Sequence, residues 1–233
     1  MQKLLVLLSA FFIFSCGNDT DKLTVKGNIK GLKKGTVYLK KANDTTLVTL
    51  DSLIINGNPQ FELSSAIESP EMFFLYLNKN DSKEDRISFF GDKGVTEINT
   101  TLKNFVLDAE INGSKQQDVL EKYLLMMAKF NDKNLELIKE NLDAKIANDS
   151  ALITKTENTY NSLIKRKYLY TVNFAINNKD SEVAPYLALT EIFDANIKLL
   201  DTINNSLTPE IKSSLYGKEL QEFIEKIKIE EAE

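Results

Sequence analysis

The change of hydrophobic period that decides the fold lies in residues 105–130, FVLDAEINGSKQQDVLEKYLLMMAKF. Before Asn112-Gly113, apolar and polar residues alternate in short runs, as they do in half-buried strands. After it, apolar residues recur at steps of three and four, as they do on one face of an amphipathic helix. These residues are Val119, Leu120, Tyr123, Leu124, Met127 and Phe130. The sequence therefore predicts strands followed by helices, an α+β fold.

Toward the N-terminus, about eight short strands are predicted between residues 23 and 112. Turn sequences such as residues 56–59 (NGNP) and residues 92–94 (DKG) separate them. The predicted strands are residues 23–29, 37–39, 46–55, 61–63, 72–77, 87–90, 95–98 and 105–107. Since no segment between them is long enough for the helix of a βαβ crossover, we expect an antiparallel β-sandwich or barrel.

Aromatic residues are frequent in this half of the chain. Residues 72–77 (MFFLYL) are apolar on both faces, so this strand should be covered on both sides. A sugar-binding platform is the alternative role for such rings, but the chain contains no Trp. We therefore predict that the phenylalanines fill the sandwich core. They are Phe61, Phe73, Phe74, Phe89 and Phe90.

Toward the C-terminus, several helices are predicted. The first continues its apolar stripe through Leu135, Ile138, Leu142 and Ile146, after a break at residues 131–134. The second has an apolar residue at every fourth position, namely Tyr160, Ile164, Tyr168, Val172 and Ile176. We interpret this row as a seam between helices rather than as a ligand groove.

Helix ends are marked by capping residues further along the chain. Asp180 or Ser181 is predicted to cap a third helix. Residues 208–210 (TPE) supply a capping hydroxyl, a proline for the first turn and an acid at the positive end of the helix dipole. The last helix is expected to pause at Gly217.

The N-terminus resembles a bacterial lipoprotein signal. Lys3 precedes an apolar run over residues 4–14, which is too short to cross a bilayer of about 30 Å. Residues 13–16 (IFSC) resemble a lipobox, in which Cys16 accepts a diacylglyceryl group and becomes the acylated N-terminus. The alternative is an ordinary signal peptide with an incidental cysteine. We expect lipidation at Cys16 and attachment to the cell envelope, at the outer membrane or the periplasmic face.

Composition excludes several functional classes. The 233 residues carry a net charge of −5 and include no His and one Cys. A Ser-His-Asp triad, a Cys-His dyad, a His-ligated zinc and a Cys-x-x-Cys pair are therefore ruled out. We expect no enzymatic activity, no catalytic residue, no metal, no cofactor and no nucleic-acid partner.

Three charged clusters are predicted to be solvated surface rather than sites. Residues 81–85 (DSKED) lack the spacing of a calcium loop. Residues 165–167 (KRK) form a short basic run in an acidic chain, where a nucleic-acid or lipid site is the alternative. The acidic C-terminus offers no cleft for paired carboxylates. Its members are Glu222, Glu225, Glu230, Glu231 and Glu233.

Two sets of residues form a further pattern. The first set is Val25-Lys26-Gly27, Val37-Tyr38-Leu39, Asp51-Ser52, Asn56-Gly57, Phe61 and Pro70-Glu71-Met72-Phe73. The second set is residues 184–193, residues 207–212 (LTPEIK) and Tyr216-Gly217-Lys218. The first set resembles a domain of unknown function that precedes thioredoxin-like domains in Gram-negative envelope lipoproteins. The second set resembles the segment that leads into the thioredoxin-like domain.

The chain departs from this family near its end. The thioredoxin-like domain would begin soon after Lys228, whereas the sequence runs only to Glu233. The resemblance therefore implies an envelope location and a non-catalytic domain, and it transfers no thiol-disulfide activity.

We divide the chain into a signal peptide (1–15), a lipid-anchored tether (16–22), a β-sandwich (23–112), an α-helical domain (113–229) and an acidic tail (230–233). The predicted function is a docking module for an envelope protein. The first alternative is a surface lipoprotein that binds a glycan, peptide or small ligand in a concave pocket. The second alternative is an enzyme that uses only carboxylates, Lys, Ser or Tyr.

Overall fold

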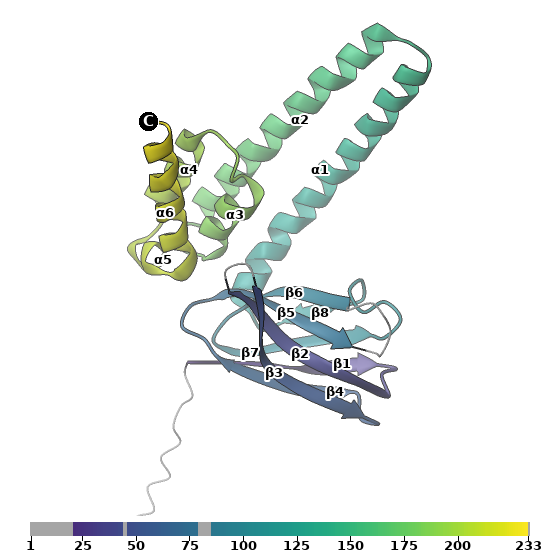
Figure 1. The fold of residues 1–233 in the computed structure, drawn as a ribbon, viewed down its shortest axis with the longest axis vertical. Helices are drawn as coiled ribbons and strands as arrows, with labels where there is room; N and C mark the ends of the chain where they lie inside the picture. Colours follow the sequence, from purple (N-terminus) through teal and green to yellow (C-terminus); the bar gives the residue numbers. More distant parts are fainter. Residues whose placement is uncertain (1–20, 44–45, 79–84, 233) are drawn as a thin grey trace, which may run out of the picture.

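A computed structural model describes residues 21–43, 46–78 and 85–232 of the chain. Within these residues, eight strands are followed by six helices, which confirms the α+β prediction (Figure 1). The predicted signal peptide, Cys16 and most of the tether lie outside the described residues, as do residues 81–84 of one acidic cluster.

The described strands form two four-stranded sheets that pack as a sandwich. The first sheet has the order β4-β1-β7-β8, and the second has the order β3-β2-β5-β6. The first sheet contains β1 (Lys22–Lys30), β4 (Gln60–Ala66), β7 (Gly94–Thr101) and β8 (Glu110–Asn112). The second contains β2 (Lys34–Asn43), β3 (Thr46–Asn56), β5 (Glu71–Asn78) and β6 (Asp85–Gly91). The sandwich alternative is confirmed, because neither sheet closes into a barrel.

The inward-facing side chains of both sheets form one apolar core. Leu23, Val25 and Ile29 alternate along β1, and each is fully buried. Phe73 of β5 and Phe89 of β6 stack inside it with ring centroids 5.9 Å apart. The period-2 alternation read from the sequence is therefore the alternation between core and solvent.

Two details of the sheets differ from the prediction. Strands β1 and β7 pair in parallel, so the sandwich is not wholly antiparallel. The strand predicted at residues 105–107 is wrong, and the last strand is β8. Residues 104–108 form a turn in which the Asp108 N–H donates to the Asn104 carbonyl (2.9 Å) and the Thr101 hydroxyl donates to Asp108 (2.7 Å). Residues 105–107 are thus flanked by Asn104 and Asp108, whose hydrogen bonds form a turn instead of pairing this segment with a neighbouring strand.

The helical half begins at Ser114, whose hydroxyl accepts from the Gln117 N–H (3.2 Å) and caps α1. Thr208 caps α5 as predicted. The helices are α1 (Lys115–Ile146), α2 (Ser150–Asn177), α3 (Val183–Glu191), α4 (Ile197–Ser206), α5 (Pro209–Ser213) and α6 (Leu215–Glu230).

Three predicted helix boundaries are corrected. Helix α1 continues through residues 131–134, because Asn costs a helix only a fraction of a kcal/mol and neither Pro nor Gly is present there. The pause near the C-terminus falls at Ser214, and Gly217 lies inside α6. Helix α3 begins at Val183, so Ser181 lies one residue before the cap position, where its hydroxyl accepts from the Val183 N–H (3.2 Å).

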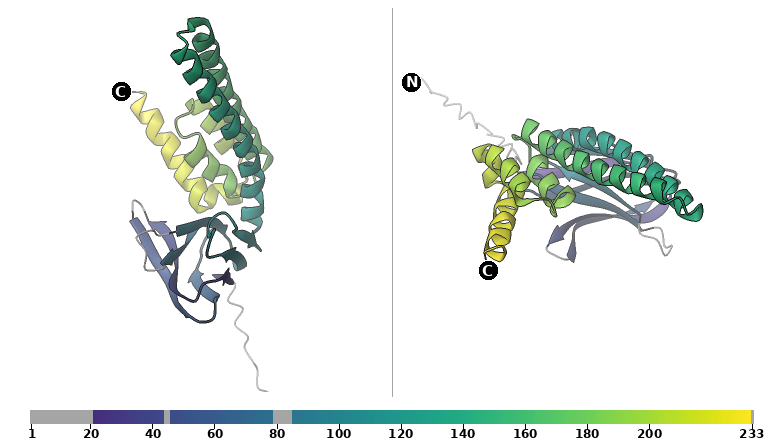
Figure 2. Two further views of the ribbon diagram at one scale, coloured as in Figure 1. Left: turned by 90° about the vertical axis from the view of Figure 1, so that its right-hand side faces the viewer. Right: turned by 90° about the horizontal axis from the view of Figure 1, so that it is seen from above.

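Helices α1 and α2 form a long antiparallel hairpin (Figure 1). The Tyr123 and Thr171 hydroxyls hydrogen-bond at 2.8 Å near its base, and Asn141 donates to Thr156 (2.6 Å) near its tip. The shorter helices α3–α6 gather beside the base of the hairpin, and the tip extends beyond them (Figures 1 and 2). The hairpin therefore projects away from the sandwich as an arm.

An aromatic cluster joins the sandwich to the helices. Phe90 of β6 is fully buried, with its ring 5.5 Å from that of Tyr186 and 5.8 Å from that of Tyr216. The Phe90 N–H donates to Gln117 (2.8 Å), and the Met72 N–H donates to the Tyr216 hydroxyl (3.0 Å). The prediction that Phe90 lies in the sandwich core is wrong, because it belongs to this junction.

Strand β5 is fully buried on its inner face and covered in part on its outer face. Phe73 faces the sandwich core, and Met72 packs in the junction cluster. Phe74 lies on the same outer face as Met72 and is only half-buried, with the Arg86 guanidinium 5.2 Å from its ring. The core assignment is therefore correct for Phe61, Phe73 and Phe89, and wrong for Phe74.

Candidate functional site

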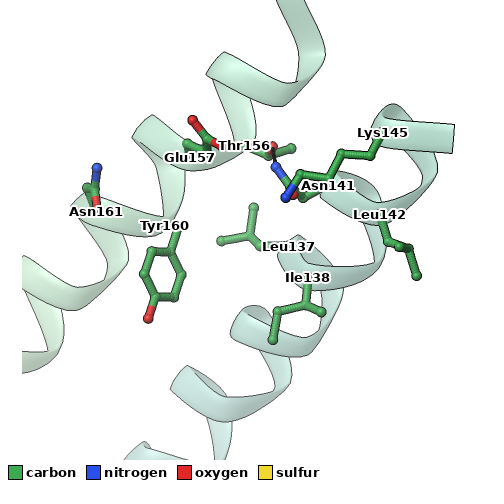
Figure 3. Close-up of a pocket in the computed structure, with 9 residues that line it drawn as sticks. All are labelled: Leu137, Ile138, Asn141, Leu142, Lys145, Thr156, Glu157, Tyr160 and Asn161. Carbon is green, nitrogen blue, oxygen red and sulfur yellow. Dashed lines mark hydrogen bonds between the residues drawn. The ribbon is translucent and has the colours of Figure 1, made fainter. Parts of the chain in front are cut away.

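The arm carries an apolar groove of about 560 Å³ between α1 and α2, close to its tip. Figure 3 shows its side chains, which come from both helices. On α1 they are Leu137, Ile138, Asn141, Leu142 and Lys145, and on α2 they are Thr156, Glu157, Tyr160 and Asn161. It combines a buried apolar floor with an exposed apolar rim.

The floor of the groove is set by the seam between the two helices. Leu137 is buried between them, and the Asn141 amide donates to the Thr156 hydroxyl across the seam beside it. Ile138 and Leu142 are each more than half exposed, and Tyr160 is 42% exposed on the facing helix. Exposed large apolar side chains around a hollow are typical of a surface that receives a partner.

The apolar residues of α1 cover a wider arc of the helix surface than its buried contacts require. Leu120, Tyr123 and Met127 face the protein and are buried. The residues predicted to continue this stripe are instead exposed, with Leu135 at 64% and Ile146 at 73%. The single stripe predicted for this helix is therefore divided into a buried part and an exposed part.

The apolar row predicted on the second helix, now α2, also lies in two different environments. Tyr160 lies at the rim of the seam between α1 and α2, where it lines the groove and is 42% exposed. Tyr168 packs at the edge of the α3–α6 core, where its hydroxyl donates to Asp194 (2.7 Å). This hydrogen bond, with partial burial, raises the pKa of Tyr168 to about 12.

A second, larger cleft of about 1060 Å³ lies where the sandwich meets the helices. Carboxylates outnumber lysines among its lining residues. The acids are Glu68, Glu71, Asp92, Asp180, Glu182, Glu210, Glu219 and Glu222, and the bases are Lys41, Lys93 and Lys218. Lys41 pairs with the buried Glu71 (2.9 Å). This cleft is polar and negatively charged, in contrast to the groove on the arm.

The pKa values of two carboxyl groups in the cleft are shifted in the same direction. Burial, followed by the charges of Asp92 and Glu210, raises the pKa of Glu182, which is 8% exposed. Burial, followed by the charges of Glu222 and Glu71, raises the pKa of Glu219. Each carboxyl therefore resists ionisation in the folded protein.

We expect Glu182→Gln to increase the free energy of unfolding at pH 7. Because the folded-state pKa is raised, the contribution of Glu182 is favourable below the ordinary glutamate pKa of about 4.3 and is lost as the pH rises through the folded-state value. Urea unfolding at pH 7 and pH 4 measures the gain, which should disappear at the lower pH. Glu62→Gln, at an exposed position on β4, is the matched control and should change little. An equal gain at both pH values would contradict the prediction.

The other charged candidates lie on the surface. Lys165 and Arg166 are exposed, and Lys167 pairs with Glu191 (3.0 Å). Glu222 borders the polar cleft, and Glu225 accepts a hydrogen bond from Gln221. Glu230 is the last residue of α6, so part of the expected acidic tail is helical.

Within residues 21–43, 46–78 and 85–232, no group of three His, Cys, Asp or Glu side chains is placed to hold a metal ion. In the same ranges, none of the helices is long and apolar enough to span a bilayer.

Comparison with known families assigns one part of the chain. Residues 23–120 match the family described as Domain of unknown function (DUF4369). The match covers the sandwich and the first residues of α1, and the groove of the arm lies beyond it. No curated protein matches the chain.

Proposed function

We propose that the protein is a non-catalytic, lipid-anchored envelope lipoprotein that docks another protein through the groove of its α1–α2 arm. The exposed Ile138, Leu142 and Tyr160 around this groove carry the proposal. An amphipathic helix lays its apolar face into a groove of this kind, with anchors at steps of three and four residues.

The remaining parts of the chain have supporting roles in this proposal. Acyl chains on Cys16 hold the protein at the membrane, and the tether keeps the sandwich within roughly 20 Å of it. The sandwich and the junction cluster then form a base from which the arm extends. The resemblance to domains that precede thioredoxin-like domains supports an envelope location, and a separately encoded thioredoxin-like protein is one candidate partner.

Photo-cross-linking in cells tests the docking surface. A benzoylphenylalanine at Leu142 of the full-length chain should give a discrete protein adduct on illumination, because this side chain borders the groove. The same label at Ile54, which is 78% exposed on β3, is the control and should give none. Mass spectrometry of the same sample should show acylated Cys16. If the two positions give the same adducts, or if neither gives one, the arm is not the docking surface.

The acidic cleft supports a second candidate function, the binding of a basic peptide. Eight carboxylates against three lysines give its walls a negative charge that favours Lys- and Arg-rich ligands. Calorimetry with pentalysine should show binding that weakens at least tenfold between 50 and 300 mM salt, because exposed charges are screened. Glu222→Gln, which removes an exposed carboxylate from the cleft wall, should weaken the binding at low salt. Absence of heat at low salt would exclude this candidate.

A further inference from the structure

One side of α1 repeats apolar residues with the spacing of a two-helix seam. Along it, the spacing between successive residues alternates between four and three. Two positions of this series are polar, namely Asn131 and Lys145. All of these positions are exposed, whereas the seam toward α2 uses other residues. The apolar members are Leu124, Ala128, Leu135, Ile138 and Leu142, which we call the outer seam.

The outer seam has a shallow hollow at one end and the groove at the other. The hollow measures about 580 Å³ and lies between β8 and α1, where Ile111, Leu124 and Leu125 line it. The groove near the tip includes Ile138 and Leu142 of the same seam. From Leu124 to Ile146, α1 rises about 33 Å at 1.5 Å per residue. The apolar surface therefore continues along most of the arm.

The residues that flank the outer seam are self-complementary. Leu125, Asp132, Lys139 and Ile146 follow one another at seven-residue intervals, and all four are exposed. They are symmetric about the midpoint between residues 135 and 136. A twofold axis through that point, perpendicular to two antiparallel helices, places Asp132 opposite Lys139 and Leu125 opposite Ile146 of the second copy. Each of these favourable pairs occurs twice, as an isologous interface requires.

The alternative parallel arrangement lacks this complementarity. In a parallel pair, the flanking residues face the opposite flank of the second helix. That flank holds Met127, Asn134 and Asn141, none of which carries a charge. Asp132 and Lys139 would then have no opposite charge across the interface. The charge pattern therefore favours the antiparallel arrangement.

We propose that the partner docked by the arm is a second copy of this chain, paired antiparallel through the outer seam. The inference rests on the proposed docking function and names its partner. Two hairpins then form a four-helix bundle, with Leu135 and Ile138 of both copies at its centre. The tip of each arm, near Ile146, enters the hollow beside Leu125 of the other copy.

Disulfide trapping tests the pairing and its direction. Cys16 is the only cysteine of the chain, so single cysteines can be introduced at Leu125→Cys and Ile146→Cys in the full-length protein. Either variant expressed alone should stay uncross-linked under a mild oxidant. The two variants co-expressed should form a disulfide-linked dimer, and the parent chain should form none. No dimer from the co-expressed variants would overturn the proposal, because a parallel pair keeps Leu125 of one copy far from Ile146 of the other.

Charge exchange provides the second readout. Asp132→Lys places like charges at both flanking pairs and should raise the dissociation constant of the detergent-solubilised dimer about tenfold, as measured by light scattering. Adding Lys139→Asp restores opposite charges and should return the constant to that of the parent. A double variant as weak as the single one would contradict the antiparallel register.

The adduct at the Leu142 label separates this inference from the proposed function. An adduct with the mass of two copies supports both. An adduct with a different protein, without a Leu125–Ile146 disulfide, overturns the second-copy inference and leaves docking intact. No adduct and no disulfide overturn both.

Discussion

Replacing Gly27 with alanine is expected to lower the free energy of unfolding by about 4 kcal/mol. Gly27 lies in the middle of β1, paired with Phe61 of β4 on one side and with Ile98 of β7 on the other. A Cβ there would overlap the Ile98 carbonyl oxygen and would lie 3.1 Å from the Phe61 ring. Since this carbonyl belongs to the backbone of a paired strand, the overlap can be relieved only if β1 and β7 move apart.

Gly57→Ala is the control that isolates this steric cause. Gly57 has a φ of +97°, and a Cβ there meets no atom within 4 Å. Its replacement should cost only the backbone strain of about 1–2 kcal/mol. Urea unfolding of both variants, followed by circular dichroism, measures the difference. A cost for Gly27→Ala no larger than that for Gly57→Ala would show that the close approach of β7 does not determine stability.

The strand partners of Gly27 are a feature of the fold that the local sequence does not predict. The alternation of Leu23, Val25 and Ile29 predicted the strand and its buried face. The partners of that strand were not predictable, because β7 lies about seventy residues further along the chain and no local pattern records a parallel pairing. The pairing depends on how the two sheets assemble, and the glycine is required only after they have done so.

The groove on the arm was likewise not predicted from the sequence. A helix that packs on one side shows one apolar stripe, and the residues of α1 were assigned to a single stripe. Leu120, Tyr123 and Met127 belong to the buried seam, whereas Leu135, Ile138 and Leu142 are exposed. The sequence contained the signal, because together the two sets cover too wide an arc of the helix for one neighbour. A helical-wheel separation of them would have predicted a second contact surface.

Phe90→Ala is expected to cost about 3–5 kcal/mol and to uncouple the helices from the sandwich. Phe90 is fully buried at the junction, against Tyr186 and Tyr216, and belongs to the same apolar cluster as Tyr123 and Leu187. The sequence gives no sign of this role, because Phe89 and Phe90 are adjacent and only the direction of each side chain separates the core from the junction. Removing the ring leaves a cavity between two tyrosines whose own burial depends on it.

The control is Phe74→Ala on the neighbouring strand, where the ring is half-buried and lies beside Arg86. It should cost about 1 kcal/mol, because less apolar surface returns to water. Thermal unfolding followed by circular dichroism at 222 nm reports the helices, and the infrared amide I band of β-sheet reports the sandwich. In the parent protein the two signals should change together, and in Phe90→Ala the helical signal should be lost at the lower temperature. A single unchanged transition in Phe90→Ala would mean that the polar contacts, Phe90 N–H to Gln117 and Met72 N–H to Tyr216, are enough to hold the arm on its base.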